Sequence, residues 1–538
     1  MLKKVLALLL TVAMCLSVFA ACKKDSDKKD YGSDATGSVE LGGNWEKPLF
    51  EETVKIEIHM PANDNYVIEG TYLDTLLSIN ENVDVTWTVM NSFQEQFALM
   101  AADHDLPEIT WSNSTMQYKT YGPAGAFVDI NKYLDRMPNL KAVLEKYPEA
   151  KEAYTDRESG EMWAIPCLEE YTTDPYAFIY REDVFQKLNL EWPTTQDGFY
   201  NVLKALKQEY PNSYPFVLRQ MTSNMNGLVF WLPCWGSSMI QMGKANLFTQ
   251  NADGTASYDP INQGMKECLT FLNKLYKEGL LHESVMTLTN NEWVTAFASE
   301  QSFVGWDKMD RIAIQLQPAG ENAGIDGFRL VGGAPIAFGT NGVAAITKNG
   351  VYGTYCFMIS SAVEKDANRL SQILAFMDWL YSEEGIITTN WGGEGQTWER
   401  DENGNIKYTE ALLAEDDPQL SRGMGVGSTY GVKLKDAYVG WLDETDLKSL
   451  ELANKYATLE GHPDLNGLYT EDEQLIWDTY STALFNNTHN GIQSFIIGAG
   501  GFDINKDWDN WVSRITGPKF NYAQLKQIHE AAYKRLEN

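Results

Sequence analysis

Aromatic residues stand in segments that also carry Gly, Asn, Asp or Glu in four stretches of this sequence, EITWSNS, FWLPCWGSS, VGWDKMD and NWGGEGQTWE. A flat ring covers the apolar C–H face of a sugar, and carboxylates and amides hydrogen-bond its hydroxyls. The chain has 16 tryptophans, and any single one of them is as well explained by core packing. As a group, these stretches favour a carbohydrate-binding cleft.

Glu169 and Glu170 are adjacent carboxylates that invite an acid–base interpretation. Glycoside hydrolysis needs two carboxylates that face each other, whereas neighbours in an extended chain point to opposite sides. The sequence has no G-x-S-x-G elbow and no P-loop, and residues 498–501 (GAGG) lack the spacing of a dinucleotide loop. A carboxylate pair assembled from distant segments stays open, but we expect a binding protein and not an enzyme.

Metal-ligating side chains show no pattern. No two of the six histidines are three or four residues apart, and DENGN (401–405) lacks the spacing and terminal Glu of a calcium loop. Cys167, Cys234, Cys268 and Cys356 form no C-x-x-C pair. We expect no metal, no cofactor and buried free thiols. A Cys167–Cys356 or a Cys234–Cys268 bridge is the open alternative.

The amino terminus resembles a lipoprotein leader. Two lysines precede an apolar stretch from Leu6 to Ala21, which is the layout of a secretory signal and slightly short for a membrane span. Small residues directly before Cys22 resemble a bacterial lipobox, although Phe19 stands where Leu is usual. The resemblance implies that residues 1–21 are removed and that Cys22 is acylated, for example with palmitate. An ordinary cleaved signal peptide is the alternative.

Residues 22–48 predict a flexible tether, because Lys, Asp, Ser and Gly dominate them and they cannot bury enough apolar surface to offset ordering. A random coil of this length spans about 28 Å root-mean-square. The net charge of −31 argues against nucleic acid and against broad contact with anionic lipid. The remaining body is longer than one hydrophobic core usually organises, which predicts two lobes.

Alternating apolar residues predict strands in TVKIEIHM (53–60) and VDVTWTVM (83–90), with helices over 70–79 and 93–103. Strand, helix, strand, helix and a further apolar run at 107–111 indicate a parallel sheet. Ligands of such sheets bind beyond the carboxyl ends of the strands. Helical periodicity also predicts helices at 261–279 and 366–385, Asn403-Gly404 predicts a hairpin turn, and the last 35 residues look mostly helical.

Four segments resemble, in the expected order, the extracellular solute-binding proteins of ABC importers. Residues 160–206 carry a Y-x-I-P-like strand, then YR-x-D and P-x-T; residues 293–309 are similar to an F-A-x-G-K-x-A-M segment. Residues 344–399 contain DWLYSEEG and WGGEG, and residues 495–515 are similar to the closing I-x-G…W-D segment. Within this family the chain looks closest to the large carbohydrate-type lipoproteins of Gram-positive bacteria. Glu300-Gln301 and Gly305 depart from the usual residues of the second segment.

The resemblance implies an α/β, type-II periplasmic-binding-protein fold, with two discontinuous lobes joined by hinge strands. We expect lobe one at 49–167 and 358–410, lobe two at 168–357 and 411–538, and hinge crossings near 165–170 and 353–360. Ligand held between the lobes would stabilise the closed state.

Ligand contacts are expected at strand ends and on the faces between the lobes. They are Asn63, Asp64, Tyr66, Trp111 and Asn113 in lobe one; Glu169, Glu170, Trp231, Trp235, Trp306 and Asp307 at the hinge and in lobe two; and Trp391, Glu394 and Trp398, which close the site.

The leading hypothesis is a monomeric protein, lipid-anchored on the extracellular face of the cell membrane, that captures an oligosaccharide and delivers it to the permease subunits of an ABC importer. One alternative keeps the fold with a peptide or another small solute as ligand. Another is a sensory lipoprotein that presents its ligand to a membrane kinase.

Overall fold

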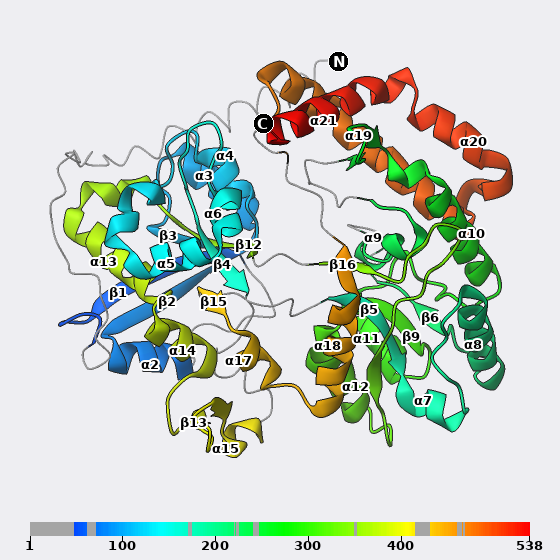
Figure 1. Ribbon diagram of the computed structural model, residues 1–538, viewed down its shortest axis with the longest axis horizontal. Helices are drawn as coiled ribbons and strands as arrows, with labels where there is room; N and C mark the ends of the chain where they lie inside the picture. The colour runs from blue at the N-terminus through cyan, green and yellow to red at the C-terminus, as the bar shows by residue number, and fades with distance from the viewer. Residues whose placement is uncertain are drawn as a thin grey trace, which may run out of the picture.

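The computed structural model describes residues 48–61, 72–169, 175–219, 221, 225–239, 247–348, 352–414, 431–459, 465 and 468–537. These residues form two lobes that lie side by side (Figure 1). The predicted ligand contacts Asn63, Asp64, Tyr66 and Glu170 lie outside the described residues, as do the leader and almost all of the tether.

Lobe one contains a six-stranded sheet in the order β15-β4-β12-β3-β1-β2. Its strands are β1 (Val54–Pro61), β2 (Val83–Met90), β3 (Ile109–Ser112), β4 (Ile165–Glu169), β12 (Tyr352–Ile359) and β15 (Val432–Lys433). β1 runs parallel to both β2 and β3, whereas β12 runs antiparallel to β3 and β4. The predicted alternation holds in β1, where Val54, Ile56 and Ile58 are buried and the residues between them are not.

Helices of lobe one cover this sheet. They are α2 (Tyr72–Asn80), α3 (Phe93–Ala102), α4 (Met116–Tyr121), η1 (Ile130–Arg136), α5 (Pro138–Lys146), α6 (Pro148–Tyr154), η5 (Ser361–Lys365), α13 (Ala367–Trp379) and α14 (Glu383–Trp391). α13 packs against α5 through the buried Asp378, which accepts the Leu140 N–H at 2.9 Å and the Asn139 Nδ2–H at 2.8 Å. Asp378 thereby binds amide groups at the start of α5, where free N–H groups need acceptors. Burial raises the pKa of Asp378 to about 6.

Lobe two is built on a four-stranded sheet in the order β10-β5-β9-β6. Its strands are β5 (Tyr176–Arg181), β6 (Phe216–Val217), β9 (Val304–Lys308) and β10 (Leu330–Gly333). Around it lie α7 (Glu182–Lys187), α8 (Gln196–Glu209), α9 (Asn226–Val229), η2 (Leu232–Trp235), η3 (Asp259–Ile261), α10 (Gln263–Lys277), α11 (Asn290–Ala298), η4 (Ile312–Leu316), α12 (Gln317–Asn322) and α18 (Glu444–Tyr456). A short hairpin, β7 (Thr249–Gln250) with β8 (Ala256–Ser257), and the pair β11 (Ile346–Thr347) with β16 (Ala457–Leu459) complete the strands of this lobe.

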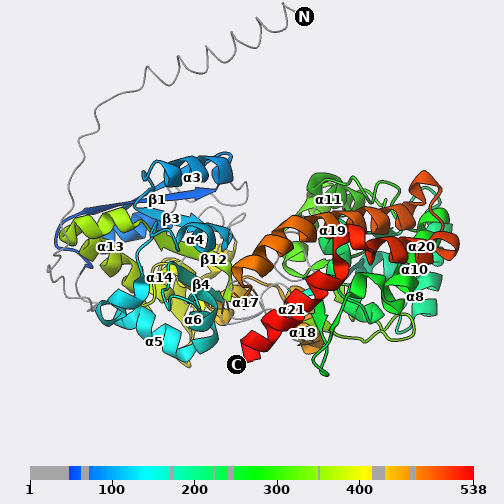
Figure 2. The same cartoon turned by 90° about the horizontal axis from the view of Figure 1, so that it is seen from above.

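The C-terminal region is helical, as predicted. It consists of α19 (Glu471–Ile497), η6 (Ala499–Gly501), α20 (Ile504–Ile515), η7 (Pro518–Phe520) and α21 (Tyr522–Glu537). α19 packs along α10 and against α20 and α21, so these helices form an outer layer on lobe two (Figure 2). Their apolar faces join the main core of the lobe, to which Trp508 and Trp511 contribute.

The chain passes between the lobes from β4 to β5, from β11 to β12 and from α17 (Lys435–Val439) to α18. The second crossing precedes Tyr352, whereas the sequence placed it at 353–360; those residues lie in or next to β12 of lobe one. Lobe one also continues beyond residue 410. β13 (Trp398–Arg400), β14 (Ile406–Tyr408) and α15 (Glu410–Leu413) pack with α14 and α17, and β15 joins the lobe-one sheet.

All four cysteines of the body are buried and free. The β12–β4 register pairs Cys356 with Pro166 and Phe357 with Ile165. Because side chains alternate between the two faces of a strand, Cys167 shares a face with Ile165 and points away from Cys356. Burial raises the thiol pKa of both residues.

A buried carboxyl pair in lobe one predicts a pH dependence of stability. Glu81 is 4% exposed, its Oε2 accepts the Leu49 N–H at 3.0 Å, and its carboxyl group shares a hydrogen bond with Glu384. Burial, and secondly the Glu384 charge, raise the pKa of Glu81 from 4.5 to about 7. The protonated form is thus favoured by folding, so this contribution to stability is fully present below pH 4.5 and is lost as the pH rises through 7.

We therefore expect the free energy of unfolding to fall by on the order of 2–3 kcal/mol between pH 4.5 and pH 8 because of this pair. Glu81→Gln keeps an acceptor for Leu49 and should flatten this part of the profile. Urea unfolding at several pH values measures it, with the exposed Glu95→Gln in α3 as matched control. An unchanged slope in Glu81→Gln would contradict the prediction.

Candidate functional site

The hinge-facing edge of the lobe-one sheet is defined by strand direction. β4 leaves the lobe at Glu169 and β12 enters it at Tyr352, and the carboxyl end of β3 reaches the same edge because Ser112 pairs with Cys356. In Figure 1 the carboxyl end of β4 and the start of β12 lie on the side of lobe one that faces the other lobe. Loops and residues at this edge are therefore placed to contact a ligand held between the lobes.

Trp111 and Tyr355 form a stacked pair at this edge, with ring centroids 5.5 Å apart and an interplanar angle of 20°. Trp111 faces Phe357 in the β3–β12 register, so Tyr355 lies on the same face of β12, two residues nearer the hinge. Trp111 is fully buried, whereas Tyr355 is only partly buried. The sequence singled out Trp111, but the ring with an accessible surface is Tyr355.

Asn113 is exposed immediately beyond β3, as expected for a ligand contact. The turn that presents it is fixed by the buried Ser112, whose Oγ donates to the Ser114 carbonyl at 3.0 Å or to Gln117 Oε1 at 2.9 Å. Gln117 Nε2 in turn donates to Gln94 Oε1 at 2.8 Å. This network fixes the direction of the chain at the end of β3 without using the Asn113 side chain.

The hinge-facing edge of lobe two follows from the β5–β9 register. Tyr176, which comes directly after the first crossing, pairs with Lys308 at the end of β9, and β6 runs parallel to β9. The Tyr176 and Phe230 rings stack here, with centroids 4.0 Å apart and an angle of 12°. Phe230 keeps part of its surface accessible, so a second aromatic pair lies at the edge of the opposite lobe.

Asp307 forms a buried ion pair with Arg219. Asp307 is 1% exposed and Arg219 is 5% exposed. The guanidinium donates from Nε to Oδ2 at 2.5 Å and from Nη2 to Oδ1 at 2.8 Å, and Oδ1 also accepts the Lys308 N–H at 2.8 Å. The carboxylate is thus occupied by protein donors, so Asp307 fixes the end of β9 and is not positioned to receive a sugar hydroxyl.

Directly after β9, Asp310 and Arg311 place a carboxylate and a guanidinium at the same edge. Arg311 Nε lies 3.6 Å from Asp310 Oδ1, and each side chain keeps 20% of its surface exposed. Sequence reasoning selected neither residue, although Asp310 ends the VGWDKMD stretch that it used and Arg311 follows directly. We call the residues at the two edges the sheet-edge site; its members are Asn113, Glu169, Tyr176, Phe230, Asp310, Arg311 and Tyr355.

Trp231, Trp235 and Trp306 are core residues of lobe two, in contrast to their expected role at the ligand. All three are 0% exposed and share the main core of this lobe. Trp231 contacts Trp235 edge-to-face at 5.6 Å, and Trp306 contacts Phe178 in the same way at 4.9 Å. Stacking on a sugar needs an accessible ring face, which these rings do not have in this structure.

Trp391 and Trp398 lie apart from these rings, in a small cluster of lobe one with Tyr408. They are 4% and 5% exposed, and the Trp398 Nε1–H donates to the Gly392 carbonyl at 3.0 Å. Glu394 is exposed in the turn between them. Glu169 is partly buried at the end of β4 and faces Lys433 of β15 in the register. The structure thus does not bring the predicted tryptophans together in one crevice.

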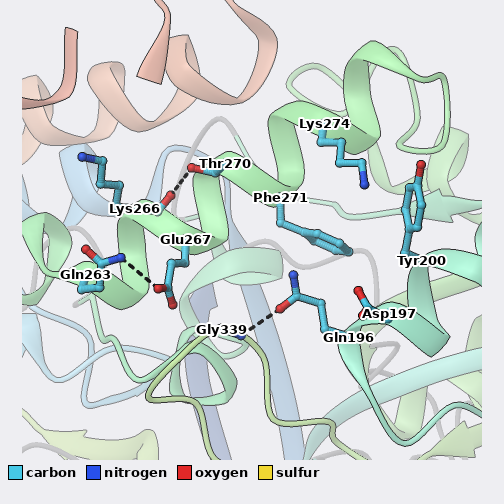
Figure 3. Close-up of a pocket in the computed structure, with 10 residues that line it drawn as sticks. All are labelled: Gln196, Asp197, Tyr200, Gln263, Lys266, Glu267, Thr270, Phe271, Lys274 and Gly339. Atoms are coloured by element: carbon cyan, nitrogen blue, oxygen red, sulfur yellow. Dashed lines mark hydrogen bonds between the residues drawn. The ribbon is translucent and has the colours of Figure 1, made fainter. Parts of the chain in front are cut away.

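A separate groove of about 440 Å³ lies on the outside of lobe two, between α8, α10 and the loop at Gly339 (Figure 3). Glu267 accepts the Thr340 N–H at 2.7 Å and the Gln263 Nε2–H at 2.8 Å. Lys274 Nζ lies 3.6 Å from the centre of the Tyr200 ring, so one face of that ring is already covered. The helices α8 and α10 that line the groove lie on the side of lobe two away from lobe one (Figure 1), so we do not assign the ligand to it.

Two features are absent from the part of the chain that the structure describes. No three His, Cys, Asp or Glu side chains gather there as a metal site. No helix there combines the length and the apolar character that a membrane span needs.

The fold has two lobes whose strand ends face the three chain crossings between them. This is the fold of solute-binding proteins. It superimposes on the alginate-binding protein AlgQ2 without calcium with a TM-score of 0.71 and 22% identity, covering 91% of this chain and 100% of AlgQ2. Residues 77–387 match the family model described as bacterial extracellular solute-binding protein. The chain belongs to this family, which confirms the fold predicted from the sequence and a binding protein in place of an enzyme.

Two named relatives are similar over long stretches. Lipoprotein LipO of Bacillus subtilis (strain 168) is 26% identical over 59% of this chain and 62% of its own length, so the match spans less than two thirds of that protein. The fructooligosaccharide ABC transporter substrate-binding protein FusA of Streptococcus pneumoniae serotype 4 is 25% identical over 72% of this chain and 70% of its own length.

Proposed function

We propose that this protein captures an oligosaccharide at the sheet-edge site and delivers it to an ABC importer. The observation that carries the proposal is the pair of aromatic stacks, Trp111–Tyr355 and Tyr176–Phe230, at the hinge-facing edges of opposite lobes. Asn113, Asp310 and Arg311 supply amide, carboxylate and guanidinium groups beside them. Rings flanked by such groups suit the apolar faces and hydroxyls of sugars.

The names of relatives support the same ligand class. FusA is named for fructooligosaccharides and AlgQ2 for alginate, both of which are carbohydrates. A ligand that touches both edges at once stabilises the closed arrangement of the lobes, because these contacts are complete only in that state. The closed protein then docks on the permease subunits.

The lipid anchor is part of this proposal. Acylation of Cys22 places the protein on the extracellular face of the membrane, and the tether that follows lets the two lobes move near the importer. LipO is itself named a lipoprotein. We propose a monomer, because each chain carries both edges of the site.

Tyr355→Ala should weaken oligosaccharide binding about tenfold or more, since loss of a stacking ring costs on the order of 1.4 kcal/mol. Quenching of tryptophan fluorescence across a panel of fructo-, manno- and gluco-oligosaccharides measures the affinity. Tyr355→Phe keeps the ring and should bind within a few fold of the wild type.

Tyr200→Ala, in the outer groove of Figure 3, is the matched control and should leave affinity unchanged. The assignment of the ligand to the sheet edges would be refuted if Tyr200→Ala weakened binding and Tyr355→Ala did not. The carbohydrate proposal would fail if no sugar of the panel produced a response.

A further inference from the structure

We infer that the ligand of the sheet-edge site is an uncharged oligosaccharide and not one built from uronic acids; this inference rests on the proposed function. The distinction is a real one among proteins of this fold, because AlgQ2 is named for alginate, an acidic polymer, and FusA for fructooligosaccharides. A buried or half-buried uronate needs a cation, and arginine is the usual one, because its guanidinium binds a carboxylate in a bidentate manner.

The arginines at the hinge-facing edge of lobe two are already matched with carboxylates. Arg219 uses both Nε and Nη2 on Asp307, and the pair is almost completely buried. Arg311 lies beside Asp310 at 3.6 Å, with equal exposure of the two side chains. A ligand carboxylate at Arg311 would stand beside the Asp310 carboxylate, whose like charge opposes it.

The lysines of these edges have partners as well. Lys433 stands opposite Glu169 in the β15–β4 register, and its Nζ lies 4.5 Å from the centre of the Tyr438 ring. Lys308 and Lys348 each already have an interaction partner. A ligand carboxylate would therefore have to compete with an existing contact at each of these three lysines.

The sequence next to the edge strands adds negative charge. The segments 62–71 and 170–174 follow β1 and β4 in the chain, and 349–351 precedes β12, so each adjoins a strand at its hinge-facing end. They contain the acids Asp64, Glu69, Glu170 and Asp174 and no Lys or Arg. Together with the net charge of −31, this composition repels a polyanion on approach. A bridging metal ion would offset the repulsion, but no metal-ligating cluster is present in the described part of the chain.

The test compares neutral fructo-, manno- and gluco-oligosaccharides with galacturonate and alginate oligomers of equal length, titrated calorimetrically into the full chain. At least one neutral series should bind at least tenfold more tightly than either uronate series, and added salt should not weaken that binding. Uronate oligomers that bind as tightly as the best neutral sugar would overturn the inference and leave the proposed function intact. Binding of no carbohydrate at all would overturn both.

Asp310→Asn probes the mechanism, because it removes the negative charge that stands beside Arg311. The ratio of uronate affinity to neutral-sugar affinity should rise about fivefold or more. Asp326→Asn removes the same charge from an exposed position on lobe two and should leave the ratio unchanged. An equal rise in both variants would show that net charge and not the Asp310–Arg311 pair sets the preference, which would overturn this account.

Discussion

Asp307→Ala is expected to lower the free energy of unfolding by about 3–5 kcal/mol, since removing one partner leaves the buried Arg219 guanidinium uncompensated. Arg219 Nε and Nη2 would lose the carboxylate that they both contact, and the Lys308 N–H would lose its acceptor. Trp293, whose ring centre lies 5.1 Å from the guanidinium, cannot replace a charge. Chemical denaturation followed by circular dichroism measures the loss.

Two variants make this experiment decisive. Asp135→Ala removes an exposed carboxylate that pairs with Lys141 at 2.7 Å on the surface, and it should have a far smaller effect because solvent screens such pairs. Arg219→Met combined with Asp307→Leu removes both charges and should recover much of the stability. If Asp307→Ala were no more destabilising than Asp135→Ala, the ion pair would not hold the end of β9.

The same ion pair connects stability to ligand binding. Asp310 and Arg311 follow the end of β9, and the direction of the chain there depends on Asp307, which accepts the Lys308 N–H. The sequence identified Asp307 as a ligand contact because it stands next to a tryptophan. The structure gives it a different role, which is to position the polar residues that follow it.

Local patterns predicted the first half of lobe one well. The alternation of buried residues in β1 is visible in the sequence, and a parallel sheet places strand ends at a common edge. This argument selected the turn after β3, where Asn113 is exposed. It could not select Tyr355 or Phe230, because their positions depend on pairings and contacts between segments far apart in the chain.

The tryptophans show why side-chain context can mislead. Trp231 and Trp235 stand in a stretch that the sequence assigned to a binding cleft, but they lie at the two ends of the 3-10 turn η2, and their rings meet edge-to-face in the core of lobe two. Gly236 has φ of +68°, and a Cβ at Gly264 would lie 2.1 Å from the Trp235 carbonyl oxygen. The glycine at 264 therefore allows α10 to pack closely on this segment.

The expected lobe boundary at residue 410 was wrong, because the contacts that decide where lobe one ends join residues far apart in the chain. Asn390 Nδ2 donates to the Val432 carbonyl at 2.8 Å, and the Leu434 N–H donates to Asn390 Oδ1 at 2.9 Å. These bonds hold β15 on lobe one after the intervening segment. The chain therefore returns to lobe two only at α18, later than the expected boundary at residue 410.

Cys22→Ser should release nearly all of the protein from the membrane fraction into the medium. The proposed anchor consists of acyl chains on Cys22; a single chain gives only reversible membrane binding, with an association constant of about 10⁴ M⁻¹, whereas two hold a protein stably. No other attachment is expected from the charge of the chain, because a net charge of −31 repels anionic lipid. Fractionation of cells, followed by immunoblotting, measures the distribution.

Cys15→Ser is the matched control, since this cysteine lies inside the leader, upstream of the expected cut. It should leave the protein with the membranes, and mass spectrometry of the wild-type amino terminus should find an acylated Cys22. An ordinary cleaved signal peptide predicts the opposite: wild type and Cys22→Ser would be secreted alike, and the amino terminus would carry no lipid. Retention of Cys22→Ser at the wild-type level would instead place the attachment elsewhere in the chain and remove the lipid anchor from the proposed function.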